Sequence, residues 1–162
     1  MSNPIKKIMV YVDGTEQSVT AAQYAICLAS SSGAELIAHY VVNTRAVEDL
    51  LKARIFLKDE QVEYEHDMEA DAERYLNYID ELATKKGVSI TKKRSRGNVH
   101  KEIVDSVEND EVDLLIIGEL SRIRSRRDEF FDEAERAMRS VSCSVLIVKD
   151  EDRVWEMYES LS

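Results

Sequence analysis

A single glycine, Gly118, ends the apolar segment from Asp113 to Ile117 and is the only glycine from there to the C-terminus. A strand that enters a helix through a glycine-rich turn brings backbone N–H groups against a phosphate. The turn after Gly118 instead carries bulky and charged side chains, Glu119-Leu-Ser-Arg-Ile-Arg-Ser-Arg-Arg127. The position where a phosphate would meet bare backbone is filled, so this loop argues against a glycine cradle.

The same loop offers a second kind of chemistry through its four arginines, Arg122, Arg124, Arg126 and Arg127. Guanidinium groups bind carboxylates and phosphates through charge-assisted hydrogen bonds. The arginines could equally neutralise the acidic residues between 128 and 135, although exposed ion pairs contribute only about 0–1 kcal/mol each. Two interpretations therefore stay open, a docking loop for an acidic or phosphorylated partner and a solvated loop.

The remaining reactive residue types form no recognisable set. The three histidines, His39, His66 and His100, lie far apart without the spacing of metal ligands, so we expect no metal site. No Ser/His/Asp or Cys/His arrangement can be placed by a local motif, so we expect no catalytic residues. Cys27 and Cys143 lie within apolar patterns and share no CxxC spacing, which favours buried thiols.

Length and composition indicate one soluble domain. The chain has 162 residues, of which 44% are hydrophobic and 33% charged, enough for a sizeable core. No apolar run approaches the roughly 20 residues of a membrane span, and the N-terminus has no apolar leader, so we expect a cytoplasmic protein without membrane contact. The net charge of −10 disfavours binding to nucleic acid.

The chain alternates β-type and helical patterns throughout. The expected elements are strands at 8–12, 35–42, 88–94, 113–117 and 144–148 and helices at 19–29, 59–86, 100–109 and 128–140, with a long connection over 43–58. Such alternation predicts an α/β fold, an open five-stranded parallel sheet with helices on both faces. Ligands bind such Rossmann-like sheets at the carboxyl ends of the strands, where the winding reverses. Asp13 and Gly118 fall at that edge.

The last residues form a separate pattern. We expect a domain over 1–149 and an amphipathic tail over 150–162, which contains Trp155. An uncovered tryptophan is unfavourable, so the tail should pack on its own domain or against a second copy.

Five segments in this order resemble the universal stress protein family over residues 7–149. They are Ile8–Ser18, Gly33-Ala-Glu-Leu36, Gly97-Asn98, Asp113–Gly118 and Cys143–Val148. The resemblance implies an adenine nucleotide alpha hydrolase-like fold. It also implies that, if a nucleotide binds, Asp13, Val42, Gly118 and Ser121 contact it. Asp13 has a plain interpretation too, as a turn residue capping the first helix.

ATP-binding members of that family carry the motif G-x2-G-x9-G-[ST]. Counted from Gly118, the later positions hold Ser121, Phe131 and Asp132, so only the first position matches. A phenylalanine ring and a carboxylate then stand where a triphosphate would approach the backbone. We therefore expect no cofactor, with ATP as the less favoured alternative.

The resemblance further implies pairing through the last strand, with Trp155 nearby and Val145, Leu146, Ile147 and Val148 in the contact. That pairing would form a homodimer and would cover an open strand edge. We expect a non-enzymatic stress-response protein with a regulatory or interaction role. The alternatives are an adenine-nucleotide-binding, slowly ATP-hydrolysing protein, and an adaptor that docks a partner on the loop Arg122–Arg127.

Overall fold

The computed structural model describes residues 4–44, 52–53, 58–119 and 133–161. Five parallel strands form one sheet in the order β3-β2-β1-β4-β5. The order reverses between β1 and β4, because the chain first builds outward to β3 and then returns to the other side. The expected α/β fold with an open parallel sheet is confirmed, and its crevice lies at the carboxyl ends of β1 and β4.

The elements follow the alternation expected from the sequence. They are β1 (Lys7–Val12), α1 (Glu16–Ser32), β2 (Glu35–Asn43), α3 (Lys58–Thr84), β3 (Ile90–Gly97), α4 (Val99–Asn109), β4 (Leu114–Gly118), α6 (Glu133–Ser140), β5 (Ser144–Val148) and α7 (Glu151–Glu159). The largest shift among the strands concerns β3 (Ile90–Gly97), which was expected over 88–94. β3 continues to Gly97. Its polar residues Lys92, Arg94 and Arg96 weaken the strand signal in the sequence, but in the structure they pair with acidic residues of a helix.

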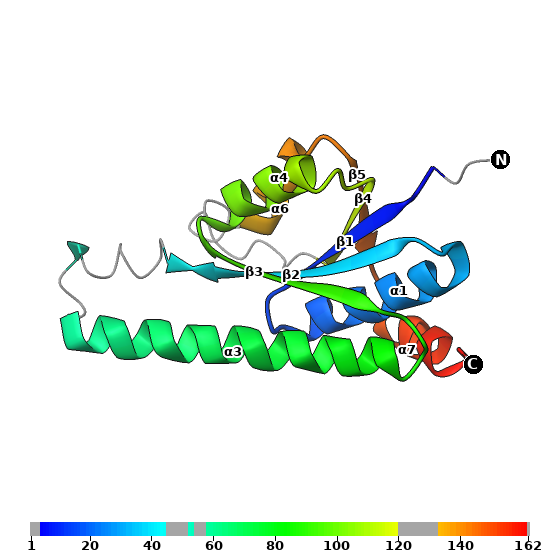
Figure 1. Cartoon of the computed structure of the whole chain (residues 1–162), viewed down its shortest axis with the longest axis horizontal. Helices are drawn as coiled ribbons and strands as arrows, with labels where there is room; N and C mark the ends of the chain where they lie inside the picture. The colour runs from blue at the N-terminus through cyan, green and yellow to red at the C-terminus, as the bar shows by residue number, and fades with distance from the viewer. Residues whose placement is uncertain (1–3, 45–51, 54–57, 120–132, 162) are drawn as a thin grey trace.

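Helices cover both faces of the sheet, so two apolar cores form. Figure 1 shows the sheet nearly edge-on, with α1, α3 and α7 on one side and α4 and α6 on the other. The larger core joins β1, β2 and β4 to the first group through residues such as Val10, Ile26 and Ile79. The smaller core includes Met9, Ile103 and Leu115. Burial on both faces explains why these strands read as continuous apolar runs.

Ion pairs attach α3 to the edge strand β3. Glu69 pairs with both Arg94 and Arg96 at 3.2 Å, and Glu65 lies 3.4 Å from Arg96. Lys92 lies 3.7 Å from Asp80. These charged pairs leave the exposed edge of the sheet unattractive to another strand.

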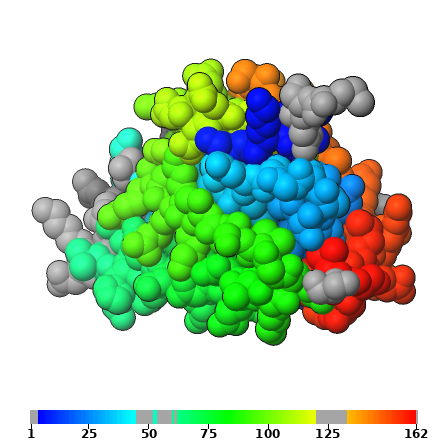
Figure 2. Space-filling view, turned by 45° about the vertical axis from the view of Figure 1, so that its right-hand side comes forward, coloured from blue at the N-terminus to red at the C-terminus, as the bar shows by residue number. Residues whose placement is uncertain are grey.

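The tail helix α7 packs on its own chain. Val154 and Tyr158 are buried against α1 and α3, and the Tyr158 hydroxyl donates a 2.6 Å hydrogen bond to the Leu82 carbonyl. Lys86 donates to the Leu161 carbonyl at 3.0 Å. Figure 2 shows α7 in red beside the C-terminal end of α3 in green. Trp155, in contrast, keeps 47% of its surface exposed.

None of the helices within the described residues is long and apolar enough to traverse a lipid bilayer.

Candidate functional site at the carboxyl edge of the sheet

The turn after β1 is held by its own side chains. The Asp13 carboxylate accepts hydrogen bonds from the Thr15 backbone N–H at 3.0 Å and from the Thr15 hydroxyl at 2.6 Å. Thr15 in turn caps α1, because its hydroxyl oxygen accepts from the Ser18 N–H at 3.1 Å. The helix cap is therefore Thr15, and Asp13 stabilises the turn one step earlier. One Asp13 oxygen is committed to this task, and the side chain is exposed.

Gly118, at the end of β4, is required by packing. A Cβ at this position would lie 2.4 Å from the backbone oxygen of Gln17, in the first turn of α1. Only glycine allows this strand end and the helix to approach so closely. This glycine therefore has a structural reason to be present that involves no phosphate.

Val42 lies near the end of β2, where the strand extends past its neighbour. The pairing of β2 with β1 ends at Val12 and Tyr40, whereas the pairing of β2 with β3 continues to Asn43 and Gly97. The Val42 side chain is fully buried. Any contact of this residue with a ligand would thus run through its backbone.

An acidic side chain occupies the neighbouring helix start. Asn98 caps α4 by accepting from the Lys101 N–H at 3.0 Å. Glu133, the first residue of α6, accepts a 3.2 Å hydrogen bond from the backbone N–H of His100, in the first turn of α4. Free N–H groups at helix starts are where phosphates bind. Here a carboxylate of the chain itself takes one of them, while its other oxygen pairs with Arg136 at 3.2 Å.

The α3 side of the crevice carries an aromatic pair. The rings of Tyr40, on β2, and Tyr75, on α3, lie 6.4 Å apart between centroids and within 9° of parallel. Arg74 lies 5.7 Å from the centre of the Tyr75 ring and is paired with Asp71. Burial, followed by the charges of Asp71 and Asp13, raises the pKa of the Tyr40 phenol. Tyr40 is therefore a neutral, packed ring at physiological pH.

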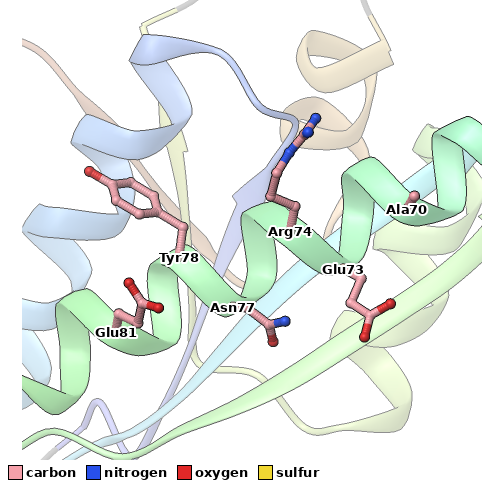
Figure 3. A pocket seen from close by; sticks show the side chains of 6 residues that line it. All are labelled: Ala70, Glu73, Arg74, Asn77, Tyr78 and Glu81. Carbon is pink, nitrogen blue, oxygen red and sulfur yellow. The ribbon is translucent and has the colours of Figure 1, made fainter.

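A shallow hollow of about 510 Å³ lies along the exposed surface of α3. Figure 3 shows the six residues that line it, with Arg74 and Glu73 pointing to opposite sides of the helix. All six come from this one helix, so no second element closes the hollow around a ligand. It has none of the convergent polar groups of a binding site.

Two serine–histidine contacts exist that the sequence did not reveal, and neither forms an activated nucleophile. His100 Nε2 lies 2.9 Å from the Ser140 hydroxyl, which itself donates to the Arg136 carbonyl at 2.8 Å. The imidazole must then donate to the serine, which is the reverse of a general base. The other pair, His39 Nε2 and Ser95 Oγ at 2.7 Å, involves a fully buried imidazole.

Among the described residues we see neither a cluster of metal ligands nor a reactive thiol. Across the residues that the structure describes, no three His, Cys, Asp or Glu side chains gather as ligands. Cys27 is buried and Cys143 half-buried, and both are free. Burial raises the pKa of each thiol, which keeps both protonated and unreactive.

Comparison with known proteins identifies the family of this chain. Residues 4–149 match the model of the Universal stress protein family. The chain belongs to this family. It is 30% identical over 147 residues to universal stress protein MJ0531 of Methanocaldococcus jannaschii, covering 91% of this chain and 84% of that protein.

Solved structures show the same fold at lower identity. The protein MJ0577 superimposes with a TM-score of 0.74 at 19% identity, over 93% of this chain and 99% of the other. A universal stress protein family member from Arabidopsis thaliana, solved with AMP bound, gives a TM-score of 0.66 at 14% identity, over 91% and 94% of the two chains. The resemblance to the universal stress protein family read from the sequence is confirmed.

The predicted site residues divide into three groups. Asp13, Gly118 and Val42 come together at the carboxyl ends of β1, β4 and β2. The residues discussed in the loop after Gly118 lie outside the described residues. They are Ser121, Arg122, Arg124, Arg126, Arg127, Phe131 and Asp132. The predicted dimer residues Val145, Leu146, Ile147 and Val148 form β5, which the strand order places at the sheet edge.

Sequence reasoning missed the roles of Glu133 and Tyr75. Glu133 was counted only among acids that the arginines could neutralise. Tyr75 lies in the helix expected over 59–86, but nothing local in the sequence indicates that its ring meets the turn after β1. Both roles depend on contacts between residues more than 30 positions apart.

Proposed function

We propose that this universal stress protein acts without catalysis, as a regulatory or interaction protein, and does not bind ATP in the manner of the nucleotide-binding members of its family. The observation that carries the proposal is the hydrogen bond between the Glu133 carboxylate and the His100 N–H at 3.2 Å. A carboxylate at this helix start competes with phosphate for the same donor and repels it. The substitutions at Phe131 and Asp132, directly before Glu133, support the same conclusion.

Isothermal titration of the full chain with ATP and Mg²⁺ tests this proposal. We expect no saturable binding in the micromolar range at ordinary salt. The Glu133→Gln variant should bind inorganic triphosphate more tightly than the wild type, since it removes a charge at the helix start. The Glu135→Gln variant is the matched control, because it removes the same charge from a side chain paired with Arg139 at 2.7 Å. Micromolar ATP affinity of the wild type would falsify the proposal.

The alternative is an adenine-nucleotide-binding protein with slow ATP hydrolysis, and one observation favours nucleotide binding. The structurally similar Arabidopsis protein was solved with AMP bound. AMP carries one phosphate, so its binding needs fewer phosphate contacts from the loop after Gly118 than the binding of ATP does. Titration with AMP beside ATP separates the two functions, since binding of AMP alone would favour this alternative.

We further propose that the protein works in the cytoplasm as a homodimer joined along β5. Ile147 on this edge strand is 37% exposed and Trp155 on the adjoining helix is 47% exposed, so apolar surface is available beside open backbone groups. Pairing of two edges would satisfy those groups. An adaptor role for the loop Arg122–Arg127 remains a prediction on residues outside the described part of the chain.

A further inference from the structure

The ring of Tyr75 lies directly against the backbone of Gly14, in the turn that follows Asp13. A Cβ built on Gly14 would meet Tyr75 Cε2 at 2.6 Å and Cζ at 2.9 Å. Gly14 also has a φ of +84°, which favours glycine. The turn and the ring are therefore fitted to each other, and the ring reaches this turn from the middle of α3.

The space between the Tyr75 ring and Gly14 and the space between the Tyr75 and Tyr40 rings are each too narrow for another aromatic group. Tyr75 Cε2 is no more than about 4 Å from the Gly14 Cα, since the 2.6 Å contact adds to one C–C bond of about 1.5 Å. A ring inserted between two surfaces needs about 3.5 Å on each side, or about 7 Å in all. The centroids of Tyr75 and Tyr40 are only 6.4 Å apart, with the planes nearly parallel. A flat ligand can enter neither space without displacing Tyr75.

Neighbouring groups hold the ring in place. Tyr40 flanks it, and the guanidinium of Arg74 lies 5.7 Å from its centre. Arg74 is itself paired with Asp71, one turn earlier on α3. Stacking and cation–π contacts of this kind each stabilise a ring in one position.

We propose that Tyr75 is a built-in occupant of the crevice on the side of β1 and β2, where it excludes planar aromatic ligands such as a purine base from the turn at Asp13. This inference rests on the proposed function and deepens it. Glu133 disfavours the phosphate end of a nucleotide near α4 and α6, whereas Tyr75 excludes the base near α3. The two obstacles belong to different helices and can be removed separately.

Adenosine, which has a base and ribose but no phosphate, is the probe for Tyr75. Binding is followed through the backbone amide NMR signals of residues 13–15. The Tyr75→Ala variant should bind adenosine at least about tenfold more tightly than the wild type, because base–aromatic stacking on Tyr40 replaces the lost ring. Tyr75→Phe keeps the ring and should behave like the wild type. Tyr78→Ala is the matched control, since Tyr78 lies on the same helix and is 40% exposed.

Tyr75→Leu provides a second test if the alanine variant does not fold, because leucine keeps an apolar group against Gly14. Folded variants that gain no adenosine affinity overturn the proposal, and so does a wild type that binds adenosine as tightly as they do. Loss of folding in both variants also overturns it, since the ring would then serve the core. Binding of inorganic triphosphate to the wild type contradicts the proposed function and leaves the role of Tyr75 intact.

Discussion

His39 gives the most quantitative prediction, because it is a titratable side chain with no exposed surface. It lies on β2, where its Nε2 is 2.7 Å from the Ser95 hydroxyl. Its Nδ1 is buried and has no hydrogen-bond partner among the described residues. Protonation would therefore create a charge and an unsatisfied donor inside the protein. The charged groups nearby are Lys93 and Asp110, which pair with each other at 2.7 Å.

Burial, with a smaller effect of Lys93 and an opposing effect of Asp110, lowers the pKa of His39 from 6.5 to about 4. The unfolded chain then binds the proton more readily than the folded chain. Stability is complete above about pH 6.5 and is lost as the pH falls toward 4. The full difference corresponds to about 3 kcal/mol, and the part lost between pH 7.5 and pH 5.0 is about 2 kcal/mol.

Urea unfolding at pH 7.5 and pH 5.0 measures this loss. The many carboxylates also titrate, so the wild type is compared with His39→Gln, which cannot take up the proton. We expect the variant to lose about 2 kcal/mol less than the wild type between the two pH values. His66→Asn, at an exposed position on α3, is the control and should lose as much as the wild type. Equal losses in wild type and His39→Gln would refute the reasoning.

Two further predictions concern the close approach at β4 and the proposed dimer. Gly118→Ala should lower the free energy of unfolding by about 3 kcal/mol or more, because its Cβ meets the Gln17 carbonyl oxygen. Gly33→Ala, where open space surrounds a φ of +75°, should cost roughly 1 kcal/mol, and an equal cost for both in urea unfolding would contradict the packing argument. Light scattering should give wild type a mass twice that of one chain and Ile147→Lys the mass of a monomer. Val62→Lys, at a 68% exposed site on α3, should stay dimeric, and a monomeric wild type would reject the β5 interface.

The sheet could be predicted from sequence mainly because its three central strands, β1, β2 and β4, are buried on both faces. The strand at 144–148 was predicted with the observed bounds, since its apolar residues stand out from polar neighbours. β3 was the least accurate strand. Its outer residues are lysines and arginines that pair with α3, and a charged edge strand carries little apolar signal.

The positions of Asp13 and Gly118 at one edge also followed from the sequence, because parallel strands bring their carboxyl ends together. What the sequence could not supply was the direction of side chains from other helices. Glu133 lies 33 residues from His100 in the chain, and their contact depends on how α4 and α6 cross on one face of the sheet. No local pattern encodes that crossing.

The nucleotide-site positions that this chain retains have structural reasons of their own. Gly118 allows α1 to approach β4, and Asp13 anchors the turn that begins α1. Selection for folding alone would keep both residues whether or not a nucleotide binds. An aspartate after the first strand and a glycine after the fourth are therefore weak grounds for assigning ATP binding to a chain of this family. The stronger grounds are the residues that a ligand must displace, which here are Tyr75 and Glu133.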